Sequence, residues 1–186
     1  MNNFSELIKA RRSTRKFTEQ LLYPKQVELI LKAGLMSPSS KRSTPWQFVV
    51  VENKEMLKKL AACKSGSAKF LEECAIAIVV TANVMESEAW IEDASIASIM
   101  MQLQAEDLGL GSCWCQVRGR QTEHETDSAQ YVRDLLNMPY QLEVLSIIGF
   151  GYKAQSSKPF DESYLKWEKV HIETYQAPED KKDLTV

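Results

Sequence analysis

The hydrophobic positions of the chain recur with two different spacings, which predict a mixture of helices and strands. Apolar residues at helical spacing predict helices over residues 4–11, 24–34, 54–62, 86–108 and 127–136. Short β-rich or continuously apolar runs predict strands over residues 48–51, 75–81, 112–117 and 142–148. Because these elements mix without a steady strand–helix–strand alternation, the sequence predicts an α+β fold rather than a doubly wound parallel sheet.

Residues 86–108 form the longest predicted helix, and its apolar residues lie on more than one side. A helix of this kind is buried in a core or at an interface. Small residues such as Ala94, Ala97 and Ser98 would allow a second helix to approach closely. We therefore expect this helix to be central to the fold and to contribute to a homodimer.

The chain becomes polar from Gln155 onward, but aromatic residues recur within this segment. Phe160, Tyr164, Trp167 and Tyr175 are too widely spaced to build a core of their own. Such a segment usually packs on another surface. We expect a single domain over 1–186, in which 155–186 is a C-terminal extension that packs on a partner subunit.

Composition narrows the classes of protein that fit. The chain has 186 residues, of which 44% are hydrophobic and 26% charged, and this mix is typical of one folded domain. A net charge of −2 gives no indication of nucleic-acid binding. The N-terminal residues do not resemble a secretory signal, and no apolar run is long enough to span a bilayer. We expect a cytoplasmic protein that binds neither membrane nor nucleic acid.

The four cysteines do not indicate a metal site. None belongs to a CxxC pair, and only His124 and His171 could complete a ligand set. We expect no bound metal, and we expect the cysteines to be reduced thiols that pack as small hydrophobic residues.

A basic stretch stands near the start of this acidic protein, with five cations among the eight residues from Lys9 to Lys16. Cations at a helix C-terminus are favoured by the helix dipole, so a solvated helix end explains the stretch most simply. A nucleic-acid patch is a second interpretation, but no other basic cluster supports it. The third is a phosphate site, in which guanidinium groups bind bidentately and Ser13 and Thr14 donate from their hydroxyls.

A second segment, from Ser37 to Phe48, lies between a predicted helix and a predicted strand and reads SPSSKRSTPWQF. Its turn-forming residues are typical of an ordinary connecting loop. The same segment is rich in small hydroxyls and backbone donors, so it could also line a flat polar ligand.

Taken together and in order, these segments resemble the short form of the FMN-dependent nitroreductase family. Three further segments later in the chain resemble that family as well. The five matching segments are Arg11–Arg15, Ser37–Ser40 with Pro45–Phe48, Leu108–Trp114, Ile147–Tyr152 and Trp167–His171.

The resemblance implies an intertwined homodimer with a central, mostly antiparallel sheet flanked by helices, and two FMN sites at the subunit interface. It implies that one subunit holds the phosphate and ribityl groups while the other lines the isoalloxazine ring. The residues implied are Arg11, Arg12, Ser13 and Arg15 for the phosphate side, Pro38, Ser39 and Ser40 for the ring, and Cys115, Gln116 and Val117 near the ring edge.

The chain departs from the family pattern at Arg42, where the family commonly has an Asn that meets the polar edge of the flavin. Arginine can donate a hydrogen bond but cannot accept one. The family also often places a late basic residue on the phosphate, and Lys158 and Lys166 are the candidates here.

The resemblance implies an oxidoreductase that passes electrons from NAD(P)H through FMN to a nitroaromatic, a quinone or an enone. The cofactor carries out this chemistry, so no catalytic side chain is expected. A non-catalytic flavin or small-ligand binder is the alternative, and a nucleic-acid binder is a third class. The segment Gly149–Ala154 matches the dinucleotide pattern GxGxxA, but no helix is predicted after it, so we do not expect it to bind pyrophosphate.

Overall fold

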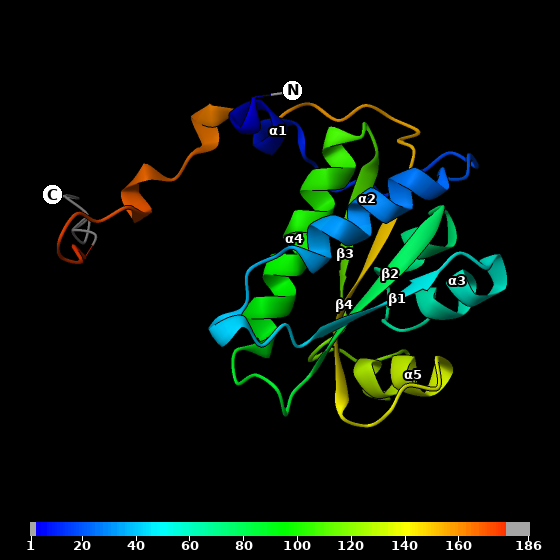
Figure 1. Ribbon diagram of the computed structural model, residues 1–186. Helices are drawn as coiled ribbons and strands as arrows, with labels where there is room; N and C mark the ends of the chain where they lie inside the picture. Colours follow the sequence, from blue (N-terminus) through cyan, green and yellow to red (C-terminus); the bar gives the residue numbers. More distant parts are fainter. Residues whose placement is uncertain (1–2, 178–186) are drawn as a thin grey trace, which may run out of the picture.

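The computed structural model describes residues 3–177 and has an antiparallel sheet at its centre (Figure 1). In spatial order the strands are β1 (Trp46–Val51), β2 (Ile76–Asn83), β4 (Leu142–Gly151) and β3 (Gly111–Gln116). Every neighbouring pair is antiparallel. The predicted α+β class and the antiparallel sheet are therefore confirmed.

Helices cover both faces of the sheet, so the domain has three layers. On one face lie α2 (Pro24–Leu35) and α4 (Trp90–Asp107); on the other lie α3 (Lys54–Ala61) and α5 (Ser128–Leu135). The short helix α1 (Phe4–Ala10) packs at one end of α4 (Figure 1). Within residues 3–177 the remaining elements are four short 3₁₀ turns: η1 (Ser40–Arg42), η2 (Lys69–Glu72), η3 (Glu162–Tyr164) and η4 (Trp167–Lys169).

The two central strands explain the continuous apolar runs of the sequence. On β2, Ala77 and Val79 face the core under α3 and α5, whereas Ile78 and Val80 face the core under α2 and α4. Successive strand residues point to opposite faces, so a strand covered on both sides needs apolar residues at every position. The sequence therefore predicts β2 and β4 from their apolar content alone.

The long helix α4 is apolar on two sides, as the sequence predicts. Ala97 and Met101 are fully buried against the domain's own core. On the opposite side, Ile96, Ile99 and Met100 are each between 37% and 39% exposed. Within residues 3–177, no helix combines the length and the apolar character that crossing a membrane requires. The helix thus has an exposed apolar side in addition to its buried one.

The start of α4 differs from the prediction. The helix begins at Trp90 rather than at residue 86, because the preceding residues form turns. The Ser87 hydroxyl accepts a hydrogen bond from the Ala89 N–H at 3.2 Å and donates one to Asp93 at 2.9 Å. These side-chain contacts end the turn segment and start the helix, and apolar spacing does not reveal them.

The chain after β4 runs away from the sheet (orange to red in Figure 1). Gly149 and Gly151 belong to β4, and no α-helix follows them in the described part of the chain. Tyr164, Trp167 and Tyr175 are more than 70% exposed, so the described part of the tail has no core of its own. Its packing on a partner subunit stays a prediction, and residues 178–186 lie outside the described residues.

Candidate functional site

Residues 11–15, which we call the cationic segment, follow α1 and lie along the edge strand β3. Arg11 ends the helix, and its N–H donates to the Leu7 carbonyl at 3.0 Å. Ser13 then forms a parallel bridge with Ser112, while the Thr14 N–H donates to the Ser112 carbonyl at 2.9 Å. The backbone of the segment is therefore fixed to the sheet.

This close approach requires a glycine on β3. A Cβ atom at Gly111 would lie only 2.6–2.7 Å from three side-chain atoms of Thr14. Thr14 is itself buried, so it has little room to move. The glycine allows the cationic segment to pack directly on the strand.

We expect Gly111→Ala to lower the free energy of unfolding by roughly 1–3 kcal/mol, because it overpacks the contact with Thr14. Urea denaturation measures this change. Gly34→Ala is the matched control, since the new Cβ would lie 3.0 Å from Met101 and 3.1 Å from Phe48, a milder overlap than the 2.6 Å at Gly111. Alanine also suits the helix in which Gly34 lies, so we expect a smaller loss there. Equal stability of Gly111→Ala and the wild type would contradict this account of the packing.

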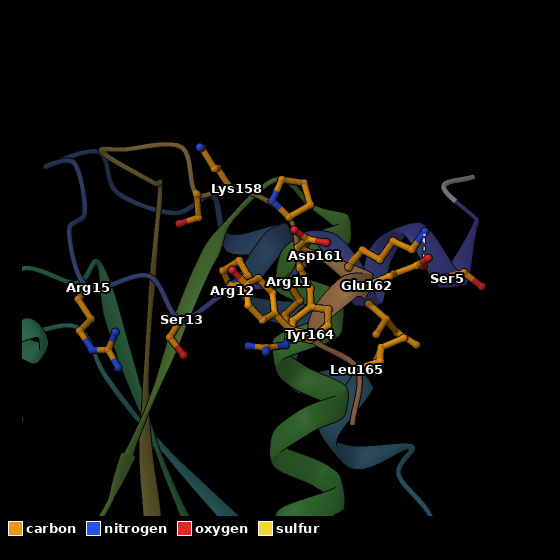
Figure 2. Close-up of a pocket in the computed structure, with 15 residues that line it drawn as sticks. Ser5, Arg11, Arg12, Ser13, Arg15, Lys158, Asp161, Glu162, Tyr164 and Leu165 are labelled. Carbon is orange, nitrogen blue, oxygen red and sulfur yellow. Dashed lines mark ion pairs between the residues drawn. The ribbon is translucent and has the colours of Figure 1, made fainter. Parts of the chain in front are cut away.

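A hollow of about 1440 Å³ lies between α1, the cationic segment and the tail. Figure 2 shows Arg11, Arg12, Ser13 and Arg15 entering from the segment after α1, with Lys158 coming from the tail. Among the ion pairs of residues 3–177, none involves any of these three arginines or Lys158. The hollow thus brings four unneutralised cations together, which suits an anionic ligand.

Two contacts tie the tail to α1 and place Lys158 at the hollow. The Phe160 N–H donates to the Lys9 carbonyl at 2.8 Å, and Lys9 Nζ pairs with Glu162 at 2.7 Å. The hydrogen bond to Glu162 is the main cause that raises the pKa of Lys9. Lys166 does not line the hollow and instead lies 4.0 Å from Glu168. Of the two late basic candidates, only Lys158 is brought to the cationic segment.

Carboxylates also line the hollow, but they are engaged in local contacts. Glu162 pairs with Lys9, and Asp161 accepts a hydrogen bond from the Ser163 N–H at 3.0 Å. That bond lowers the pKa of Asp161. These acids therefore organise the tail rather than neutralise the three arginines.

The segment from Ser37 to Pro45, which we call the hydroxyl-rich loop, does not line this hollow and lies beside the first turn of α4. The Ser40 N–H donates to Asp93 Oδ1 at 2.7 Å, and the other carboxylate oxygen of Asp93 accepts from the Ser87 hydroxyl. Asp93 is only 2% exposed. Our sequence interpretation did not single out Asp93, although a signal was present: it lies on the same helical stripe as Ala97 and Met101, and an acid on an apolar stripe needs a partner.

The backbone of this loop is strained. Lys41, Arg42 and Thr44 have φ values of 52°, 57° and 46°, in the left-handed region that non-glycine residues rarely adopt. Two bonds within the loop hold this shape: the Thr44 N–H donates to Ser39 Oγ at 3.0 Å, and the Ser43 hydroxyl donates to the Ser40 carbonyl at 2.9 Å. Strain of this kind persists only where the surroundings over-determine the conformation, as they do at ligand-binding loops.

The sequence also predicts that residues 115–117, at the end of β3, lie near the edge of the flavin ring. Their side chains point to different faces of the sheet. The side chains of Cys115 and Val117 face the core under α3 and α5 and are almost completely buried. Gln116 accepts from Trp114 Nε1 at 3.0 Å and donates to the Arg118 carbonyl at 2.8 Å. Of the three, only the Gln116 side chain and the backbone of the strand can face a ligand.

The cysteines are buried thiols. Burial raises the pKa of Cys74 to about 12 and is the main cause that raises the pKa of Cys113. The charge of Arg15 acts in the opposite direction and lowers the pKa of Cys113 in part. Within residues 3–177, no group of three or more side chains of the kinds that usually bind metals comes together.

The helix α4 holds the loop and the cationic segment at opposite ends. Asp93 in its first turn bonds Ser40, whereas Gln102 donates to the Ser112 hydroxyl at 3.2 Å, next to the cationic segment. Gly111, which contacts Thr14, follows the end of the helix. The helix rises about 21 Å from residue 93 to residue 107. The helix therefore holds the two motifs apart within one chain.

The fold and these segments define a class of proteins: a three-layered α+β domain with an arginine-rich segment on the edge strand and a hydroxyl-rich loop at the start of the long helix. A sequence model of the nitroreductase family matches residues 8–65 and 62–152. The chain belongs to the nitroreductase family, as its motifs predict, and by class it is a nitroreductase-type oxidoreductase.

Two relatives of known sequence match along most of their length. A protein of Archaeoglobus fulgidus, named as a candidate NADH dehydrogenase/NAD(P)H nitroreductase, is 31% identical over 181 residues, which are 94% of this chain and 100% of the relative. A Methanothermobacter thermautotrophicus protein with the same name is 31% identical over 173 residues, 91% of this chain and 86% of the relative.

Solved structures agree with the fold. An FMN-dependent nitroreductase from Clostridium difficile R20291 superposes with a TM-score of 0.90 and 40% identity, covering 92% of this chain and 99% of that one. A candidate nitroreductase from Desulfovibrio desulfuricans, solved in complex with FMN, gives a TM-score of 0.76 at 23% identity and covers 95% of this chain and 99% of that one. The second likeness concerns the fold alone.

Proposed function

We propose that the protein is an FMN-dependent oxidoreductase that passes electrons from NAD(P)H to a small oxidised acceptor such as a nitroaromatic, a quinone or an enone. The observation that carries the proposal is the hollow lined by Arg11, Arg12, Arg15 and Lys158, four cations without an ion-pair partner in residues 3–177. A phosphate group fits such a donor set. The names of the Clostridium and Archaeoglobus proteins support the cofactor and the electron donor.

The proposal gives the two motifs separate parts of the ligand. The guanidinium groups of the cationic segment hold the phosphate, and the Ser13 hydroxyl holds the ribityl chain or the phosphate. The loop at Pro38, Ser39 and Ser40 lines the isoalloxazine ring. Arg42 and the Cys115–Val117 strand end lie near the edge of the ring, where donors stabilise negative charge.

When bound, FMN supplies the hydride chemistry between the nicotinamide and the acceptor. The chain's own residues bind the phosphate, orient the ring and shape one ring face for donor and acceptor in turn. No acid or base is needed at the reacting atoms. Because NAD(P)H is available in the cytoplasm, we place the enzyme there.

We further propose that the active form is a homodimer in which each site takes its cationic segment from one subunit and its hydroxyl-rich loop from the other. The span of α4 between the two motifs and the outward apolar side of that helix support this arrangement. In this proposal residues 1–186 form one domain, and the exposed aromatic residues of the 155–186 extension pack on the partner subunit.

Spectra and turnover of the purified protein test the proposal. We expect a yellow protein, or a colourless one that takes up added FMN, that oxidises NADH or NADPH steadily when a quinone or nitroaromatic is present. Protein that binds FMN but does not turn over would favour the non-catalytic flavin binder. Protein that neither contains nor takes up FMN would refute the proposal.

Substitution of Arg42 tests whether its positive charge influences the midpoint potential of the flavin ring. If its guanidinium lies near the ring, its charge favours the reduced anionic flavin over the oxidised neutral one, so Arg42→Asn lowers the midpoint potential by on the order of tens of millivolts. Redox titration of the flavin measures this, and acceptors should reoxidise the variant faster. Lys41→Asn is the control, since it removes the same charge from the neighbouring residue. An unchanged potential in a fully flavinated Arg42→Asn protein would show that Arg42 turns away from the ring.

A further inference from the structure

We propose that Asp93 is a positioning residue for the flavin ring: its carboxylate holds the hydroxyl-rich loop in the shape that binds the ring. This inference rests on the proposed function, because the loop is the part of the chain assigned to the isoalloxazine. Asp93 touches neither the ring nor the reacting atoms in this proposal, and it acts through the backbone of Ser40.

The environment of Asp93 is built to keep a carboxylate in place. It is 2% exposed, and the salt bridges of residues 3–177 give it no cationic partner. Two donors satisfy it instead, the Ser40 N–H at 2.7 Å and the Ser87 hydroxyl at 2.9 Å. The residue also lies in the first turn of α4, where the helix dipole favours an anion. Burying an acid here is costly without these donors, which makes the contact to the loop obligatory.

The loop depends on this contact. Residues 41, 42 and 44 have positive φ, and backbone strain of this kind persists only when neighbouring contacts impose it. At the two ends of the loop, Ser37 bonds the Gly34 carbonyl of α2 and the Pro45 carbonyl accepts from the Asn83 N–H of β2. Between these ends, over residues 38–44 of the described structure, the Ser40–Asp93 bond is the one that joins the loop to another element. Ser40 and Asp93 are 53 residues apart in the sequence. Asp93 is therefore the hydrogen-bonded anchor between the strained loop and the long helix.

Asp93→Asn and Asp93→Ala test the anchor, with dissociation constants for both FMN and riboflavin as the readout. The loop is assigned to the ring, which the two ligands share, so we expect both to weaken by the same factor. A hydrogen bond to a charged group is strong enough for a loss of about tenfold or more in the alanine variant. Asparagine keeps one acceptor for the Ser40 N–H, so the affinities should fall in the order Asp, Asn, Ala.

Glu92→Gln is the matched control, because Glu92 precedes Asp93 on the same helix and is exposed. It should leave both dissociation constants unchanged. A merely structural role for Asp93 would lower the melting temperature while the folded variant bound both flavins as tightly as the wild type. That result overturns the inference, as does a loss confined to FMN. Failure of the wild type to bind either flavin would instead refute the proposed function, so the two failures are distinguishable.

Discussion

A heterodimer of two defective chains is expected to recover about half of the wild-type activity and one FMN per dimer. One chain carries Arg12→Ala with Arg15→Ala in the cationic segment, and the other carries Ser40→Pro in the loop. Each homodimer should bind FMN poorly. In the heterodimer one site receives both defects, and the other is built from an intact segment of one chain and an intact loop of the other.

The variants are chosen so that each removes one half of the site. The loss of two charge-assisted contacts, each worth roughly 1.5–3 kcal/mol, weakens FMN binding by several decades. Proline at position 40 has no N–H to donate to Asp93. Ser39 already has an extended backbone (φ −139°, ψ 158°), which is the conformation that a following proline demands, so the change removes the Ser40–Asp93 bond without a clash against Ser39.

Co-expression with two different affinity tags and sequential purification yields the heterodimer. FMN content and NAD(P)H oxidation are then compared with those of the two homodimers, prepared identically. A heterodimer that is as inactive as its parents would show that both motifs of a site belong to one chain, against the shared arrangement.

Arg15→Ala alone should weaken FMN binding by about one to two decades, because one charge-assisted hydrogen bond to the phosphate is lost. Riboflavin lacks the phosphate, so its affinity should change much less. Fluorescence titration of flavin-free protein with both ligands measures the two effects.

Lys16→Ala is the control for Arg15→Ala. Lys16 is the next residue and has the same charge, but its ammonium pairs with Glu73 at 3.2 Å and does not line the hollow. It should leave both affinities close to those of the wild type. An equal loss of FMN and riboflavin in Arg15→Ala would move Arg15 away from the phosphate.

Helices and strands with buried apolar faces could be predicted from the spacing of apolar residues in the sequence. The strand predicted over 75–81 is β2 (Ile76–Asn83), and the helix predicted over 127–136 is α5 (Ser128–Leu135). Apolar spacing shows which residues are covered, and it therefore locates the middle of an element better than its ends. The start of α4 was missed because Ser87 and Asp93, which set it, are polar.

The candidate site was less accessible to sequence reasoning. From composition alone, the simplest interpretation of the cations near Arg15 was a solvated helix end. The phosphate-site interpretation was favoured only by the resemblance to the nitroreductase family. The structure adds that α1 is a helix of seven residues whose following cations line a hollow shared with Lys158. Asp93 escaped attention because its significance lies in a contact with Ser40, which the chain brings close only on folding.

The residues that α4 carries at its two ends also limit how this protein can vary in evolution. A single inserted residue between Asp93 and Gln102 would rotate one relative to the other by about 100° around the helix axis, so only one could keep its partner. A whole inserted turn would keep both facing inward but would separate them by a further ~5.4 Å. Insertions and deletions should therefore be tolerated in the turns before Trp90 and in the tail, whereas changes in the length of α4 should not be.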